Sequence, residues 1–227
     1  MKVRDVCLIA HAKGRDAIKS VAPEVRVGMT LDLQDFSPGA GGEALYRRVY
    51  DESRAPFYEA ARNDDFLGVQ PYMRYTFGPE GLIPADPAGE RNQWGQTCPP
   101  DVAATVAREA HAAAGVPIIV TENGIDTLDD AQRIRFTRAS VEALSAEVDR
   151  GLPLHGYIHW TLMDDYSWSA GYAPRFGMCS VNRTTFRRTP KPSLAAYRAL
   201  IGDMKRKHRW ASGKSVAANP FQENHHA

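Results

Sequence analysis

The segment Val116-Pro117-Ile118-Ile119-Val120-Thr121-Glu122-Asn123-Gly124 joins a short apolar run to a carboxylate and a turn. A continuous apolar run of this length predicts a strand buried on both faces, as in a parallel sheet. Asn123-Gly124 indicates a turn, because both residues tolerate positive φ. Glu122 should therefore lie at the C-terminal end of a buried strand, where active sites of α/β barrels and open α/β sheets form. The alternative is that Glu122 caps the next helix or pairs with an arginine.

The composition is that of an ordinary soluble globular domain. The 227 residues are 43% hydrophobic and 24% charged, which suits one domain or one large piece of a barrel. The formal net charge of +1 gives no electrostatic case for nucleic acid or an anionic membrane surface. No apolar run approaches the roughly 20 residues that span a bilayer. We therefore expect neither a nucleic-acid nor a membrane partner.

The cysteines Cys7, Cys98 and Cys179 are far apart and odd in number. They show neither metal-ligand spacing nor a disulfide framework, which favours buried free thiols and a reducing cytoplasm. The N-terminus also lacks the long apolar core of a signal peptide. We expect a cytoplasmic protein that uses no metal and no cofactor.

Helical and strand patterns alternate along the chain. Strands are expected at 25–33, 65–72, 116–120 and 153–163. Helices are expected at 4–21, 43–61 with an interruption at Pro56, 101–114 with Asp101 as N-cap, 127–150 with Thr127 and Asp130 in a near capping box, and 193–204. The segment 74–100 is rich in Gly and Pro and predicts a long loop on the active face.

This alternation predicts parallel strands joined by helical crossovers, an α/β fold. A closed (β/α)₈ barrel needs eight strands, and only four are found, so the chain resembles half of one. Residues 1–204 are expected to form the half-barrel. Residues 205–227 are basic and then polar, and are expected to form a flexible tail.

Four motifs occur together in order, and they resemble glycoside hydrolase family 1, the β-glucosidase-like (β/α)₈ barrels. The resemblance covers the C-terminal half of that family, about four β/α units. The motifs are Asp65-Phe66-Leu67-Gly68-Val69 with Tyr72, Thr121-Glu122-Asn123-Gly124, Gly156–Asp165 followed by Trp168 and Arg175-Phe176-Gly177, and Arg188-Thr189-Pro190-Lys191.

The resemblance implies roles for four residues. Glu122 matches the catalytic nucleophile, Tyr72 matches the tyrosine that hydrogen-bonds it, and Trp160 and Trp168 match aromatic residues of the glycone pocket. A retaining glycosidase forms a glycosyl-enzyme on one carboxylate, while a second carboxyl about 5–5.5 Å away acts as acid and then base. The alternatives are a core aromatic for Trp160 and a buried tyrosine satisfied by backbone for Tyr72.

Three departures from the family pattern matter. The acid/base glutamate of the family lies in a Thr-x-Asn-Glu-Pro motif that does not occur here. Ser167 stands where the family has a glutamate that binds glycone hydroxyls, and Gln70 stands where it has an asparagine. Asp32, Asp164 and Asp165 are weak replacements for the acid, so general acid catalysis, which supplies about 10²–10⁴-fold, is expected to be missing.

Two hypotheses follow from the resemblance. The first is a β-glycosidase that acts with retention on a small carbohydrate or aryl glycoside, in an incomplete chain that needs a missing N-terminal half. The second is a non-catalytic half-barrel that binds sugar or assembles with another chain. Either way, open sheet edges predict self-association or pairing. An open doubly wound α/β sheet with an unrelated site is a third possibility, which the Trp-containing fourth strand disfavours.

Overall fold

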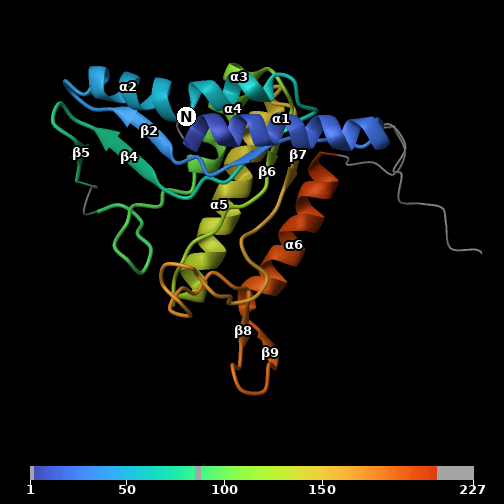
Figure 1. The fold of residues 1–227 in the computed structure, drawn as a ribbon. Coiled ribbons are helices and arrows are strands. Elements are labelled where there is room, and N and C mark those ends of the chain that lie inside the picture. The colour runs from blue at the N-terminus through green and yellow to red at the C-terminus, as the bar shows by residue number, and fades with distance from the viewer. Residues whose placement is uncertain (1–2, 85–87, 209–227) are drawn as a thin grey trace, which may run out of the picture.

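The computed structural model describes residues 3–84 and 88–208. Within these ranges the helices are α1 (Val3–Val21), α2 (Glu43–Ser53), α3 (Ala55–Ala61), α4 (Val102–Ala114), α5 (Asp130–Asp149) and α6 (Pro192–Lys207). The strands are β1 (Thr30–Leu31), β2 (Asp35–Pro38), β3 (Leu67–Val69), β4 (Arg74–Phe77), β5 (Leu82–Ile83), β6 (Ile118–Val120), β7 (Leu154–Tyr157), β8 (Cys179–Val181) and β9 (Arg188–Pro190). Figure 1 shows their arrangement.

The central sheet has four strands in the order β1-β3-β6-β7, and every pair in it is parallel. Helices connect these strands, so the prediction of four parallel strands with helical crossovers is confirmed. The strands are shorter than predicted. The second strand ends at Val69 before Pro71, which has no N–H to donate to a ladder. β1 and β7 are the outer strands of this sheet and each has one neighbour in it.

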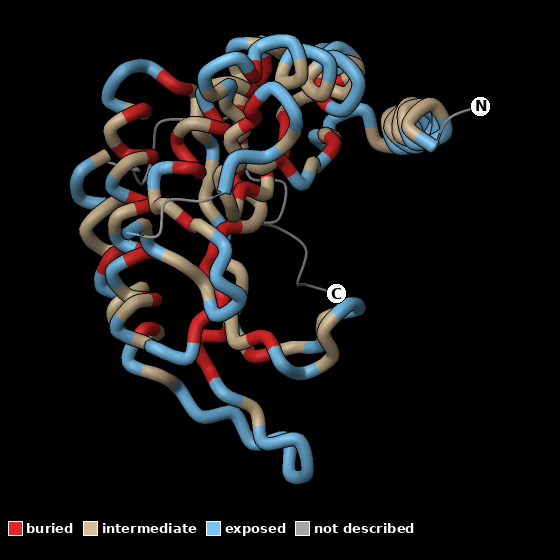
Figure 2. Tube along the Cα trace, turned by 90° about the vertical axis from the view of Figure 1, so that its left-hand side faces the viewer, coloured by how far each residue is buried: buried red, intermediate tan, exposed pale blue. Residues whose placement is uncertain are grey.

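The two faces of the sheet differ in chemistry. Leu67, Val69, Ile118 and Val120 are completely buried and pack with the alanine-rich face of α4. Figure 2 shows the buried residues along these central segments. Threonines lie on the other face, where the Thr30 and Thr121 hydroxyls are 2.8 Å apart across Gly68. In a barrel, this second face points inward.

A second sheet corrects the prediction of one long loop over 74–100. β4 pairs in parallel with β2 and antiparallel with β5, so the segment begins with two short strands. β2 was not predicted, because Pro38 and the glycines after it obscure the strand pattern. Proline is tolerated at Pro38 because it is at the end of a strand.

Three helix N-termini differ from the predictions in their breaks or capping bonds. The break in 43–61 is at Arg54, and Pro56 lies in the first turn of α3, where a proline is tolerated. Asp101 is the N-cap residue of α4, as predicted, but its side chain makes no capping bond and its carboxylate pairs with Arg74 at 2.9 Å. Asp129 caps α5 by accepting from the Ala131 N–H at 2.9 Å, so the capping box predicted at Thr127 is wrong.

The C-terminal part contains the antiparallel hairpin of β8 and β9 and then α6, which packs against α5. α6 continues to Lys207, so residues 205–207 are helical and not part of the predicted tail; residues 209–227 lie outside the described residues. Cys7 is exposed, contrary to expectation, whereas Cys98 and Cys179 are buried. Among the residues that the structure describes, no helix is both long enough and apolar enough to cross a membrane.

Candidate active site

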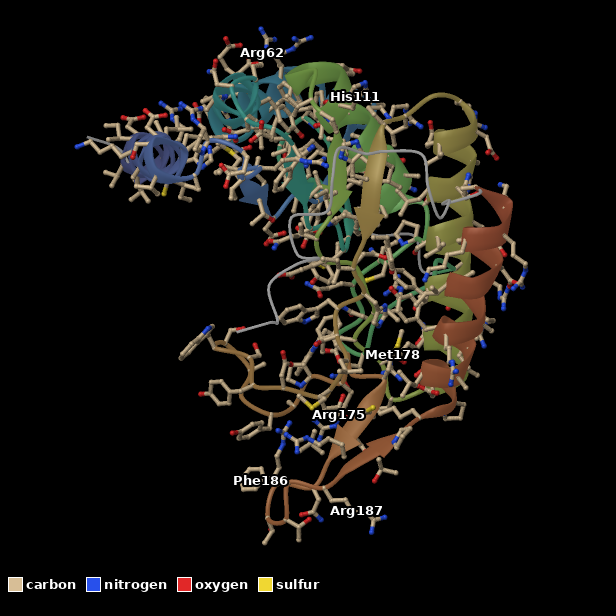
Figure 3. The ribbon with its side chains drawn as sticks, turned by 90° about the vertical axis from the view of Figure 1, so that its right-hand side faces the viewer. Arg62, His111, Arg175, Met178, Phe186 and Arg187 are labelled. Atoms are coloured by element: carbon tan, nitrogen blue, oxygen red, sulfur yellow. The ribbon has the colours of Figure 1, made fainter. Side chains whose placement is uncertain are left out.

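The site lies where the strands of the parallel sheet end. Arg175, in the loop that follows β7, is at this end of the molecule, and Arg62 and His111 are at the opposite end (Figure 3). The cleft here has a volume of about 810 Å³. Its wall contains carboxylates and aromatic rings, among them Asp32, Tyr72, Trp94, Glu122, Asp126, Trp160, Asp165, Trp168 and Phe176.

Glu122 follows β6 and its carboxylate accepts two side-chain hydrogen bonds. Gln70 donates through Nε2 to Oε1 at 2.8 Å, and the Tyr72 hydroxyl donates to Oε2 at 2.6 Å. Among the described residues, Glu122 forms no ion pair and caps no helix, so the alternative readings of this residue are wrong. Both donors come from the end of the neighbouring strand β3, which runs parallel to β6 and ends level with it.

The Tyr72 hydroxyl is a hydrogen-bond donor to Glu122. Burial raises the pKa of Tyr72 far above its ordinary value, and the hydrogen bond to Glu122 raises it further. The phenol is therefore protonated and its hydrogen points to the carboxylate. The Phe176 ring packs edge-on against Tyr72 with centroids 5.8 Å apart, which limits the tilt of the phenol.

Asn123 and Gly124, just after β6, make close contacts with the segment that follows β7. The Asn123 amide donates to Pro71 O at 2.7 Å, and Asn123 O accepts from Trp160 N at 2.9 Å. Neither residue has positive φ, so the reason given for the turn is wrong. Gly124 is required by a close approach instead, because a Cβ there would lie 2.0 Å from Trp160 O.

The tryptophans differ in exposure. Trp160 is partly buried in the wall of the cleft, whereas Trp168 is 96% exposed and contacts the Tyr166 ring at 5.8 Å. Ser167 also lines the cleft, and its hydroxyl lies 3.2 Å from that of Ser169. Gln70, which is longer than the asparagine of the family pattern, still donates a hydrogen bond to Glu122.

Asp126 is a residue that sequence reasoning missed. Its carboxylate is almost completely buried and accepts from Trp94 Nε1 at 2.5 Å, Gln93 Nε2 at 2.7 Å and Arg175 N at 2.5 Å. These bonds fix Trp94 at the cleft, on a loop that has no periodicity in sequence. The nearest indication of Asp126 in the sequence is its position, four residues after Glu122 and past the end of the same predicted strand.

A smaller apolar cavity of about 90 Å³ lies between α5, α6 and β7. Its walls come from residues such as Leu144, Leu154, Leu200 and Met204, and they include no carboxylate. We therefore place the candidate active site in the cleft at Glu122. In the described part of the chain, no group of three or more His, Cys, Asp or Glu side chains is arranged to hold a metal.

Comparisons with known proteins agree with this geometry. The model of glycosyl hydrolase family 1 matches residues 64–206, well over half of the chain. The bifunctional β-D-glucosidase/β-D-fucosidase of Bifidobacterium breve is 32% identical over 51% of this chain and 28% of its own length. The galactolipid galactosyltransferase SFR2 of Arabidopsis thaliana is 32% identical over 70% of this chain and 26% of its own.

The crystal structure of β-glycosidase BGL167 has a TM-score of 0.81 and 37% identity, and the match covers 95% of this chain and 50% of that one. The chain thus spans half or less of the length of these relatives. Its four β/α units correspond to half of a (β/α)₈ barrel. The chain belongs to glycosyl hydrolase family 1.

Proposed function

We propose that this chain carries the nucleophile of a retaining β-glycosidase. The observation that supports the proposal most directly is the carboxylate of Glu122, at the mouth of a parallel sheet, hydrogen-bonded by an amide and a phenol. Glu122 attacks the anomeric carbon while the bond to the leaving oxygen breaks, which forms a glycosyl-enzyme. Water then attacks the same carbon and releases Glu122, and the two inversions give retention.

The residues around Glu122 have distinct proposed roles. Tyr72 and Gln70 orient the attacking carboxylate, and their neutral donors leave its negative charge uncancelled. Trp160 and Trp168 offer aromatic faces to the apolar C–H groups of a sugar ring. With Ser167 in place of the family glutamate, one carboxylate that would select among glycone hydroxyls is missing. The proposed substrates are small β-glycosides, including aryl glycosides.

The second carboxyl is proposed to come from the other four strands of the barrel, here called the complementary half. Asp126 already accepts bonds from three groups. Asp32 follows β1, two strands from β6, which at about 4.8 Å a strand gives roughly 10 Å and exceeds the 5–5.5 Å of a retaining pair. Asp165 lies in the loop after β7, beyond the strand end.

A second candidate function is glycosyl transfer. The similarity to the galactolipid galactosyltransferase of Arabidopsis supports it. The chemistry needs no new residue on this chain: a sugar hydroxyl in place of water attacks the glycosyl-enzyme, loses its proton to the second carboxyl and releases Glu122.

The test uses a 2,4-dinitrophenyl 2-deoxy-2-fluoro-β-glucoside, whose good leaving group departs without an acid and whose fluorine slows the second step. Intact-mass measurement should show one glycosyl group on the chain, and peptide mapping should place it on Glu122. Glu122→Gln should remain unlabelled. The complementary half is supplied as the first half of BGL167, ended after its fourth barrel strand.

Hydrolysis of an unactivated β-glucoside should appear only with the complementary half. Labelling elsewhere, or none with or without that half, would overturn the proposal and favour a sugar-binding or assembly role. Adding an acceptor sugar separates the two enzyme functions, because a transferase gives a new glycoside and a hydrolase gives mainly free sugar.

A further inference from the structure

Tyr72, whose phenol contacts Glu122, is held through its backbone by Gln34, a glutamine beyond the end of β1. Gln34 Oε1 accepts from the backbone N–H groups of Tyr72 at 3.1 Å and Met73 at 2.7 Å. Gln34 Nε2 donates to Asp32 Oδ1 at 2.5 Å. Since only Nε2 can donate and only Oε1 can accept, these three bonds fix one orientation of the amide.

These bonds reach peptide groups that the sheet leaves unpaired. β3 ends at Val69, and Pro71 has no N–H, so the N–H groups of Tyr72 and Met73 lie past the end of the β3 ladder. Gln34 supplies their acceptor from the neighbouring strand end. Both bonds are partly buried, so losing this acceptor would cost up to the roughly 1–3 kcal/mol of a fully buried donor without one, and would favour movement of the segment.

The backbone of Gln34 is itself anchored in the core. The Arg54 guanidinium donates to Gln34 O and is 1% exposed. Its other end bonds Glu109 Oε1 at 2.7 Å, and it stacks over the Phe36 ring at 4.0 Å. A buried cation is stable only when paired and fully hydrogen-bonded, and Gln34 O is one of its partners. The core therefore fixes where Gln34 sits.

We infer that Gln34 is a positioning residue for the reaction proposed above, on which this inference rests. Three contacts define Tyr72: the backbone to Gln34, the ring to Phe176 and the hydroxyl to Glu122. The backbone contact sets the position of Tyr72, and the hydroxyl contact sets the direction of its phenol. Gln34 does not touch Glu122, and it acts by keeping the Tyr72 hydroxyl within hydrogen-bond distance of the nucleophile.

A shift of about 1 Å in a positioning contact lowers a rate by up to roughly 10²-fold. Gln34→Leu should therefore slow labelling of Glu122 by roughly 10- to 100-fold at saturating reagent. Gln34 also lines the cleft, but its bonds run to the backbone of Tyr72 and Met73, so the dissociation constant of the reagent should change by a smaller factor than the rate. A purely structural role would instead lower the fraction of folded protein and leave the rate of the folded fraction unchanged.

The decisive experiment is a double-mutant cycle with Tyr72→Phe, read as the rate constant of Glu122 labelling by the fluorinated glucoside, with the complementary half present. If Gln34 acts through Tyr72, Gln34→Leu should add little to Tyr72→Phe. Gln34→Met, which keeps the shape of the side chain, serves if Gln34→Leu fails to fold. Gln132→Leu is the matched control. This glutamine also makes two hydrogen bonds, to the Thr127 hydroxyl and to Arg91 O, and neither bond involves Tyr72 or Glu122.

The outcomes are distinguishable. A slow Gln34 variant whose effect vanishes in the Tyr72→Phe background, with a Gln132 control that labels normally, supports the inference. A Gln34 variant that labels at the wild-type rate, or whose effect multiplies with that of Tyr72→Phe, overturns it and leaves the proposed function standing. No labelling of the wild-type chain removes the proposed function, and the inference falls with it.

Discussion

At the scale of single residues, the donors that the described part of the chain gives to Glu122 are the Gln70 amide and the Tyr72 phenol. Neutral donors orient a carboxylate and leave its negative charge in place, which suits the nucleophilic role proposed for Glu122. The buried Arg54 pairs with the partly buried Glu109, which also accepts a hydrogen bond from the Tyr58 hydroxyl.

Glu109→Ala should destabilise the fold by about 3–5 kcal/mol, because it leaves the buried Arg54 cation without its carboxylate. Urea unfolding of the variant and the wild type measures the difference. Glu142→Ala is the control: its pair with Arg138 is exposed, at 3.8 Å, and its loss should cost about 0–1 kcal/mol. Equal losses for the two variants would contradict the assignment of Arg54 as a buried charge.

His159, on the chain after β7, should make stability depend on pH. Burial, with a smaller contribution from the Arg133 charge, lowers the pKa of His159 to about 4. Above pH 6.5 the imidazole is neutral in both states. As the pH falls towards 4, the unfolded chain binds a proton that the folded chain excludes, so the free energy of unfolding falls, by up to about 3 kcal/mol.

Urea unfolding at pH 7 and pH 5 tests this. His159→Leu should lose about 2 kcal/mol less than the wild type between these pH values. His155→Leu, at an exposed position on β7, should keep most of the wild-type difference. If the two variants respond alike, the buried neutral imidazole is not the source of the pH dependence.

At the scale of elements, the site depends on how closely the ends of β6 and β7 approach. Trp160 N reaches Asn123 O, and Gly124 packs against Trp160 O. Chain segments in backbone contact leave no room for a side chain, so the glycine fixes the distance between the nucleophile and the aromatic wall.

Gly124→Ala should therefore destabilise the fold by about 1–3 kcal/mol and slow labelling of Glu122, because the added Cβ forces two backbones apart. Gly14→Ala is the matched control. A Cβ at Gly14, inside α1, meets nothing within 4 Å and should stabilise the fold by about 0.5–1 kcal/mol. Thermal unfolding and the labelling rate measure both. A Gly124→Ala variant as stable as the wild type would contradict the close approach.

At the scale of the whole molecule, the parallel sheet has two outer strands. β1 pairs in it with β3 and β7 with β6. Apolar side chains such as Ile158 and Leu162 are also more than half exposed near the end of β7. Open edges and exposed apolar surface both promote association.

We expect the isolated chain to associate, and the complementary half to replace that association with a one-to-one complex. Size-exclusion chromatography with light scattering, over a range of concentrations, measures both masses. Pairing across β1 and β7 buries the outer strands and should raise the midpoint of thermal unfolding. A clean monomer at all concentrations that ignores the complementary half would contradict this expectation.

Much of the fold was predictable from sequence because its signals are local. Apolar runs and helical periodicity gave the order of the four parallel strands and the helices between them. The short strands β4 and β5 were not predictable, since they have no strong pattern of their own: β4 is held by pairing with β2 across almost 40 residues, and β5 is held by pairing with β4. The cap of α5 was misplaced by two residues because Thr127 and Asp129 both have capping side chains.

The sequence by itself determined that Glu122 ends a buried strand and that Tyr72 and Trp160 belong to the motifs of one family, because residue types and their order carry that information. Only the tertiary structure decided which donors reach the carboxylate, that Gly124 is required by a close approach, and that Gln34, Asp126 and Arg54 support the site. Those contacts join strand ends and loops distant in sequence, and they form only when parallel strands end at the same edge of the sheet.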